Sequence, residues 1–174
     1  MHPAKIPTVS NGGNQTVLGT ADATVVSSGG VEYVLAGGTA SGVTIAGGYV
    51  GVLSGGTMAG TVSFASGGEL ALYDAVAFGG LVAGFGAGDA LDLVDIPYVS
   101  SGGSATTLSW TQLTSGSSAS GTLTVAEGGS TANITLLGQY VAGSCNVASD
   151  GRGDTLVTDP PLTAAARRFS RRAG

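Results

Sequence analysis

The stretch SSGGVEYVLAGG, residues 27–38, places two Gly-Gly pairs eight residues apart around a short apolar run. Similar pairs recur along the chain. The first glycines of the main pairs stand at positions 12, 29, 47 and 67, and a second series of glycines at 19, 37 and 55 runs between them. Within each series the spacing is 17–20 residues. A repeat of this length indicates the coils of a solenoid, in which each coil stacks on its neighbours.

The apolar runs that follow the main glycine pairs keep one register. Their fourth position is always aliphatic, at Val17, Val34, Val52 and Leu72. Their first and third positions vary, as a solvent-facing side does. Parallel strands about 4.8 Å apart stack equivalent positions into columns, so these four residues are predicted to form a single interior file. A second run in each repeat is expected to turn inward Val26, Ile45 and Phe64.

Paired glycines suit the corners of such coils. Glycine adopts positive φ at little cost, and the missing Cβ lets consecutive corners approach closely. One feature conflicts with a purely apolar interior. The second position of the run shares its face with the fourth, so Gln15 and Glu32 are expected to point inward beside Val17 and Val34.

The pattern GGVEYVLAGGTASGVTIAGGYVGVLSGG resembles the repeats of AIDA-type autotransporter adhesins, and the resemblance covers roughly residues 11–80. It is carried by the glycine pairs, the Glu32 to Val34 spacing and GGTA at 37–40. The resemblance implies a right-handed parallel β-solenoid on the bacterial surface. The expected partners are surface glycans or proteins of host or neighbouring cells, or further copies of the chain. The chain departs from that family in having few coils and no recognisable translocator barrel or signal sequence.

From about residue 81 the rhythm of glycine pairs fades. TLTVAEGGSTANITLL, residues 122–137, predicts a hairpin across a glycine-bearing loop. Its facing residues are expected to be Leu123 and Val125 with Ile134 and Leu136. A solenoid end exposes unpaired strand edges and is normally covered by an atypical cap. Trp110, the single tryptophan, is expected to anchor that cap. This half resembles the segment that follows such repeats in large secreted proteins of proteobacteria.

The sequence therefore predicts an all-β chain that forms a short parallel β-solenoid with a β-rich C-terminal cap. The expected organisation is a disordered N-terminal arm over 1–10, the solenoid over 11–80, the cap over 81–160 and an Arg-rich tail over 161–174. Cys145 is the only cysteine, so no internal disulfide is possible.

Charge excludes some classes of partner. Between residues 6 and 160 there are eleven acidic residues and one basic residue, Arg152, which gives this part a formal charge of −10. Such a body repels nucleic acid and anionic lipid, so neither is expected as a partner. The chain lacks a run of about 18 apolar residues, and membrane insertion is not expected.

Residue types that perform catalysis are scarce. His2 is the single histidine and Lys5 the single lysine, so no Ser/His/Asp or Cys/His arrangement can be assembled. We therefore expect a protein that is not an enzyme and needs no cofactor. One alternative stays open, because carbohydrate-active β-helices work with paired carboxylates alone. Asp89, Asp92 and Asp95 are the candidates for such a pair.

Calcium binding is a second alternative. GAGDALDL at 86–93 and SDGRGDTL at 149–156 faintly resemble the glycine and aspartate turns of calcium-binding RTX repeats, in which stacked turns supply oxygen ligands. Asp89 and Asp92 are the candidate metal ligands. Each motif occurs once, however, and the same aspartates can cap turns through the local backbone. The RGD tripeptide at 152–154 is interpreted as accidental.

The leading hypothesis is a non-enzymatic structural and adhesive module of a secreted or surface-displayed bacterial protein. Its expected location is extracellular or at the bacterial cell surface, with the export signal outside this sequence. Binding is expected on the solvated faces of the coils, where Tyr33, Tyr49 and Glu69 lie among serines and threonines.

Overall fold

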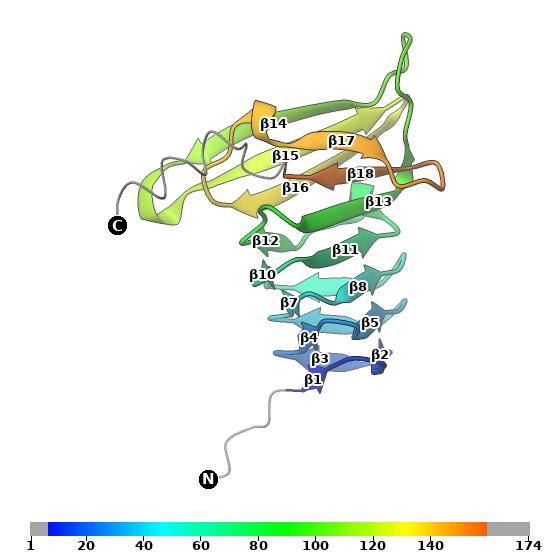
Figure 1. The fold of residues 1–174 in the computed structure, drawn as a ribbon, viewed down its shortest axis with the longest axis vertical. Helices are drawn as coiled ribbons and strands as arrows, with labels where there is room; N and C mark the ends of the chain where they lie inside the picture. Colours follow the sequence, from blue (N-terminus) through cyan, green and yellow to red (C-terminus); the bar gives the residue numbers. More distant parts are fainter. Residues whose placement is uncertain (1–6, 160–174) are drawn as a thin grey trace.

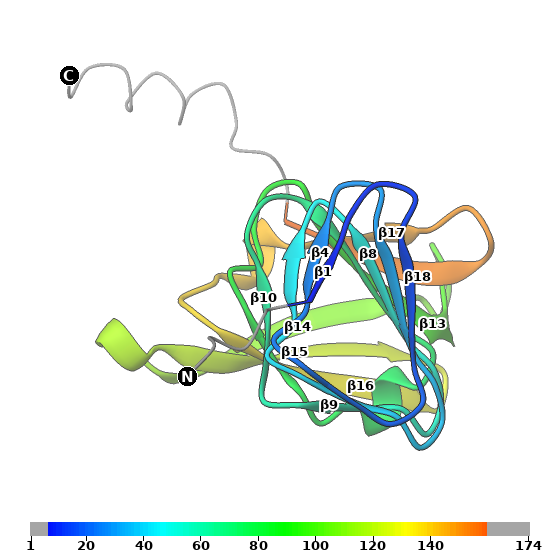
Figure 2. The ribbon, with the colours of Figure 1, turned by 90° about the horizontal axis from the view of Figure 1, so that it is seen from below.

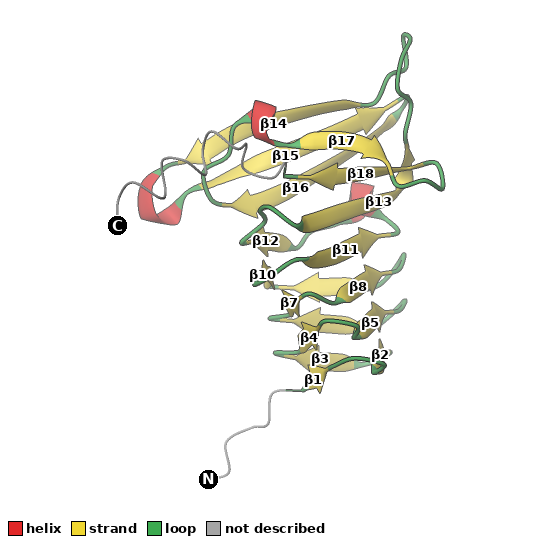
Figure 3. Ribbon diagram, viewed as in Figure 1, coloured by secondary structure: helices red, strands yellow, loops and turns green. Residues whose placement is uncertain are grey.

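The protein is a stack of β-coils covered at one end by a broader cap, as Figure 1 shows for a computed structural model. The structure describes residues 7–159. Within them the helical segments are three single 3₁₀ turns (Figure 3), namely η1 (Ala75–Ala77), η2 (Gly116–Ser118) and η3 (Ala142–Ser144). The predicted all-β parallel solenoid with a β-rich C-terminal cap is confirmed.

Each complete coil has three sides, and the strands of successive coils form three sheets. The stack makes about five turns. Figure 2 looks along the stack and shows the coils superposed as one three-sided outline. The sequence pattern indicated only two runs per repeat. The third side was missed because its strands are three residues long and carry mostly small side chains.

Each sheet joins strands that lie about one coil apart in the sequence. In order of pairing, the first sheet contains β1 (Thr8–Val9), β4 (Val25–Ser27), β7 (Thr44–Ala46), β10 (Thr61–Phe64), β12 (Leu81–Ala83), β16 (Ser130–Leu137), β15 (Ser120–Glu127) and β14 (Thr107–Thr114). The second contains β17 (Asn146–Ser149), β18 (Asp154–Thr158), β13 (Asp89–Pro97), β11 (Gly68–Leu72), β8 (Tyr49–Val52), β5 (Val31–Val34) and β2 (Asn14–Val17). The third contains β3 (Thr20–Asp22), β6 (Thr39–Ser41) and β9 (Thr57–Ala59).

The predicted interior file is present in the second sheet. Parallel pairing places Val17 beside Val34, Val34 beside Val52 and Val52 beside Leu72. Leu93 of β13 continues the same column. All five side chains are buried. Like residues on successive coils thus pack directly on one another, which is how a chain this rich in glycine builds a core.

The second run of each repeat supplies another interior column, also as predicted. Val26 pairs with Ile45, and Ile45 with Phe64, in the first sheet. Val26 and Ile45 are fully buried and Phe64 is 6% exposed. Both columns belong to the single hydrophobic core of the protein.

The two glycines of a corner pair have different tasks. Gly37 has φ of +81°, which only glycine adopts cheaply. Gly38 lies so close to the coil below that a Cβ would stand 2.2 Å from the carbonyl oxygen of Val17. Its own amide N–H donates to the carbonyl of Leu35 at 2.8 Å, closing the turn. The first glycine therefore turns the chain, and the second allows the coils to touch.

We predict that Gly38→Ala destabilises the solenoid by about 2–4 kcal/mol, because the added methyl group meets backbone atoms that move only with the whole coil. Gly19→Ala is the matched control. A Cβ at Gly19 meets nothing within 4 Å, so this variant should change stability by less than about 1 kcal/mol. Chemical denaturation measures both. Equal stability of the two variants would contradict close contact at the corners.

Glu32 points into the solenoid, as the register predicted. It is fully buried on β5, between Gln15 on β2 and Val50 on β8. Neither carboxyl oxygen has a hydrogen-bond partner. Burial raises the pKa of Glu32, and the nearby Thr24 hydroxyl acts weakly in the opposite direction. Thr24 is itself fully buried and accepts a hydrogen bond from Gln15 Nε2 at 3.5 Å. A small polar cluster therefore interrupts the apolar interior of the lower coils.

We predict that Glu32→Gln stabilises the protein by about 1–3 kcal/mol at neutral pH, since it removes a buried charge without a partner. The raised pKa of Glu32 fixes the pH dependence. Below about pH 4.3, the pKa of a glutamate in the unfolded chain, Glu32 is protonated in both states and its burial costs no charge. As the pH rises from there through the higher pKa of Glu32 in the folded protein, the stability of the folded state falls. The gain from the variant should therefore disappear near pH 4.

Chemical denaturation of both proteins at acidic and neutral pH tests this dependence. Glu127→Gln is the control, because Glu127 lies at the turn end of the β15–β16 hairpin and is not fully buried. A gain from Glu32→Gln that is the same at both pH values would contradict the assignment.

The cap extends two of the three sheets with antiparallel strands. β16 pairs in parallel with β12, after which β15 and β14 pair antiparallel. The predicted β15–β16 hairpin is present, with Leu123 opposite Ile134. Val125 lies opposite Ala132 rather than Leu136, whose partner is Gly121. Because β15 runs antiparallel to β16, and β14 antiparallel to β15, the parallel stacking of coils stops at this sheet.

Trp110 of β14 helps to hold the cap together. Its ring meets Tyr140 edge-on at 5.2 Å between centroids and covers Gly121, where a Cβ would stand 2.3 Å from the indole. The Tyr140 hydroxyl donates to the carbonyl of Phe85 at 2.9 Å, which ties the cap to the last coil. The expected anchoring role of Trp110 agrees with this packing.

Two of the expected boundaries differ from the structure. Thr8 and Val9, placed in the disordered arm over 1–10, form β1 and pair with β4, because Val9 packs on the interior column of Val26. β12 and β13 lie beyond residue 80, yet they continue the parallel stack. Residues 1–6 and the Arg-rich tail over 161–174 lie outside the described residues.

Candidate functional site

Three tyrosines gather on the outer surface of the second sheet. Tyr33 and Tyr49 alternate with the buried Val34 and Val50 and therefore point outward. Their rings meet edge-on, with centroids 5.7 Å apart. Tyr73, which follows β11, brings its hydroxyl to 3.5 Å from that of Tyr49. Tyr33, Tyr49 and Tyr73 are called the tyrosine face below.

Gly51 lies directly beneath these rings. It is paired with Tyr33 in the register of β5 and β8 and is buried. A Cβ at this position would stand 2.8 Å from Cδ1 of Tyr33 and 3.1 Å from Cε1 of Tyr49. The missing side chain thus lets both rings lie down on the sheet. Burial and the neighbouring Tyr73 hydroxyl raise the pKa of Tyr49, so the phenol stays protonated and can donate a hydrogen bond.

Two carboxyl groups adjoin the tyrosine face. Glu69 of β11 is the direct neighbour of Tyr49 on the next coil. Asp92 of β13 pairs with Ala71 and lies two positions along from Glu69 on the same outward side. Asp92 is 5% exposed, and its Oδ1 has no hydrogen-bond partner. Burial and the charge of Glu69 raise the pKa of Asp92 to about 6, and burial raises the pKa of Glu69.

The turn between β17 and β18 completes the acidic side of this face. Asp150 accepts hydrogen bonds from the backbone N–H groups of Arg152, Gly153 and Asp154, at 2.7–3.0 Å. These donors lower the pKa of Asp150. The negative charges of Asp150 and Asp154 raise the pKa of Asp92, whereas the positive charge of Arg152 lowers it. Glu69, Asp92, Asp150 and Asp154 are called the acidic edge.

A shallow furrow of about 440 Å³ runs beside the tyrosine face along the glycine corners. Tyr49 and Glu69 stand in its wall. Its other lining residues are Gly29, Gly30, Val31, Gly47, Gly48, Gly68, Gly88 and Ala90. The furrow exists because successive corners lack side chains. It gives an extended ligand a path from coil to coil, parallel to the stack.

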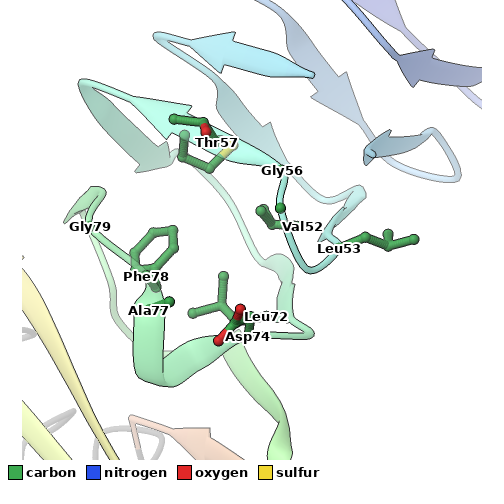
Figure 4. Close-up of a pocket in the computed structure, with 11 residues that line it drawn as sticks. Val52, Leu53, Gly56, Thr57, Leu72, Asp74, Ala77, Phe78 and Gly79 are labelled. Atoms are coloured by element: carbon green, nitrogen blue, oxygen red, sulfur yellow. The ribbon is translucent and has the colours of Figure 1, made fainter. Parts of the chain in front are cut away.

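A second pocket, of about 380 Å³, lies on another side of the stack (Figure 4). It forms where the third sheet ends at β9, because the fourth coil has the turn η1 in place of a strand. Figure 4 shows Phe78 and Thr57 beside the opening, and Leu53 pointing away from it. Asp95 caps η1 by accepting hydrogen bonds from the N–H groups of Ala75 and Val76. This pocket marks the transition from coils to cap and contains few polar side chains.

The aspartates predicted as a carboxylate pair are not brought together on one surface. Asp89 and Asp92 are three residues apart on β13, so their side chains point to opposite faces. Asp89 caps a local turn by accepting a hydrogen bond from the N–H of Gly86 at 2.8 Å. Asp95 caps η1. Glu69, two positions along from the partner of Asp92 on β11, is a carboxyl neighbour that the sequence reasoning placed among solvated residues but did not pair with Asp92.

The two glycine and aspartate motifs form turns rather than a shared ligand set. Asp89 and Asp150 each cap their own loop. Among residues 7–159 no three His, Cys, Asp or Glu side chains are grouped closely enough to hold a metal ion. Cys145 is partly buried, and burial raises the pKa of its thiol. In the RGD tripeptide, Arg152 and Gly153 are exposed in the turn before β18, and Asp154 is the partly buried first residue of that strand.

No protein-family model matches the chain, and no curated protein matches it either. In the part of the chain that the structure describes, none of the helical segments has the length and hydropathy needed to cross a membrane. The candidate site therefore rests on geometry alone. The sequence reasoning named Tyr33, Tyr49 and Glu69 and missed Tyr73 and Asp92 as members of the same face. The available signal was Tyr73 itself, which stands where the earlier repeats have Leu18, Leu35 and Leu53.

We predict that Gly51→Ala displaces the tyrosine rings while leaving the fold intact, because the new methyl group meets side chains that can rotate. The near-ultraviolet circular dichroism of the tyrosines should change, and the free energy of unfolding should fall by about 1–2 kcal/mol. The control is Gly60→Ala. Gly60 has φ of +79° but open space around it, so this variant strains the backbone without touching an aromatic ring. The same spectral change in both variants would contradict the placement of the rings.

Proposed function

We propose that the protein is a structural and adhesive module of a secreted or surface-displayed bacterial protein. In this proposal the solenoid is a rigid scaffold, and the tyrosine face with its acidic edge is the contact surface. The proposed partners are glycans or proteins on host or neighbouring cells, or further copies of the chain. The resemblance of residues 11–80 to adhesin repeats supports the proposal.

The observation that carries the proposal is the clustering of three outward-pointing tyrosines, Tyr73 exposed and Tyr33 and Tyr49 half-buried, on one sheet. Tyrosine combines a large apolar ring with a hydrogen-bonding tip, and it loses little conformational entropy on binding. Tyr73 follows the inward Leu72, points outward and is 39% exposed. Tyr33 and Tyr49 are held in place by each other and by the backbone of Gly51. A preorganised surface of this kind binds a partner at low ordering cost.

Adhesion of protein-coated beads to bacterial or epithelial cells tests the proposal. The double variant Tyr33→Ala and Tyr49→Ala should reduce the number of bound beads at least about tenfold, since buried aromatic anchors dominate binding energy. Leu113→Ala is the control, because Leu113 is 63% exposed but lies in the cap on β14. Equal binding of beads coated with the wild-type protein, the double tyrosine variant and Leu113→Ala would rule out the tyrosine face as the contact surface. Circular dichroism verifies that each variant is folded.

A further inference from the structure

The charge around the tyrosine face restricts the chemistry of a ligand. Glu69 and Asp92 lie beside it, and Asp150 and Asp154 border them. Arg152 is the only basic residue between positions 6 and 160. An anionic ligand would be repelled, whereas a cationic one would be attracted both to the site and to the acidic body as a whole.

Asp92 is the group with most to gain from a cation. It is almost fully buried, and its Oδ1 lacks a hydrogen-bond partner. Asp92 and Glu69 are kept close to one another by the pairing of β11 with β13. A ligand ammonium group would form its charge-assisted hydrogen bond with Glu69, which is partly exposed. The charge of the nearby buried Asp92, whose Oδ1 has no partner, would strengthen the attraction without direct contact.

The tyrosines restrict the shape of the ligand. Tyr33 and Tyr49 come from successive coils, and Glu69 and Asp92 come from the next two. Adjacent coils are about 4.8 Å apart. A linear chain of β-linked pyranoses advances by nearly the same distance for each sugar. Laid along the stack beside the glycine furrow, it would meet one coil with each ring.

We propose that the tyrosine face binds a linear amino-sugar polysaccharide with free amino groups, whose rings pack on Tyr33 and Tyr49 and whose ammonium groups meet Glu69 beside the buried Asp92. This inference rests on the proposed function and names the ligand class of the same surface. The aromatic rings attract both the C–H face of a pyranose and a neighbouring ammonium group. The Tyr49 and Tyr73 hydroxyls, which are only 3.5 Å apart, are placed to hydrogen-bond sugar hydroxyls.

Isothermal titration calorimetry with two oligosaccharides tests the inference. The probes are a glucosamine hexamer and the N-acetylglucosamine hexamer of the same length, at about pH 6.5, where amines are largely charged. The glucosamine hexamer should bind at least about tenfold more tightly than its acetylated counterpart. Equal affinity for the two, or a preference for the acetylated chain, would overturn the inference.

Matched variants locate the site. Glu69→Gln should weaken binding of the glucosamine hexamer about tenfold, and Glu127→Gln, which removes the same charge from the cap, should leave it unchanged. Tyr49→Ala should weaken it by a similar factor, and Leu113→Ala should not. Glu69→Gln changes a partly exposed surface residue, so its result does not depend on how well Tyr49→Ala folds. Loss of binding in the control variants as well would place the ligand elsewhere.

A lysine hexamer distinguishes sugar recognition from charge alone. It should bind more weakly than the glucosamine hexamer and be insensitive to Tyr49→Ala. If it binds equally well, the attraction is purely electrostatic and the inference is overturned. If coated beads adhere to cells but neither sugar binds, the ligand is not this saccharide, and the adhesive function stands with a protein partner. If the sugar binds as expected but beads do not adhere, the adhesive function fails instead.

Discussion

The structure depends on the close stacking of parallel coils through backbone hydrogen bonds. Strands about 4.8 Å apart leave no room for side chains where the chain turns between sides. Gly38, which would place a Cβ 2.2 Å from the Val17 carbonyl oxygen, shows this constraint most directly. The same close approach recurs at Gly30, Gly48 and Gly56, the second glycines of other pairs. The columns of Val17, Val34, Val52 and Leu72 follow from the stacking, because equivalent positions must come into contact.

This constraint also explains where polar residues are tolerated. Each coil contributes one residue to each interior column, so the nearest neighbours of a substituted side chain lie on the coils directly above and below and in the other columns of the core. Glu32 persists there between Gln15 and Val50. On the outside, each coil contributes one or two side chains to a surface that grows along the stack. The proposed ligand surface is such a product, built from Tyr33, Tyr49 and Glu69 on three consecutive coils.

The cap ends the stack of coils and also adds acidic residues to the surroundings of Asp92. The edge of β12 is covered by β16, which pairs with it in parallel and begins an antiparallel sheet, and the edge of β13 is covered by the antiparallel β18. The same reversal brings the β17–β18 turn next to β13, which adds Asp150 and Asp154 to the surroundings of Asp92. Most of the acidic edge is thus assembled where coils meet cap. A solenoid of identical coils alone would not produce this local concentration of charge.

The sequence by itself determined the winding: the glycine spacing, the aliphatic register, the inward Glu32 and the β15–β16 hairpin all follow from local periodicity and turn chemistry. It did not determine the third side of the coil, because strands such as β6, with the sequence TAS, carry too weak a pattern. It also did not place Tyr73 against Tyr49 or Asp92 beside Glu69. These residues are more than twenty positions apart, and only the pairing of successive coils makes them neighbours. That pairing depends on the exact length of every corner, which is a property of the folded stack and not of any single repeat.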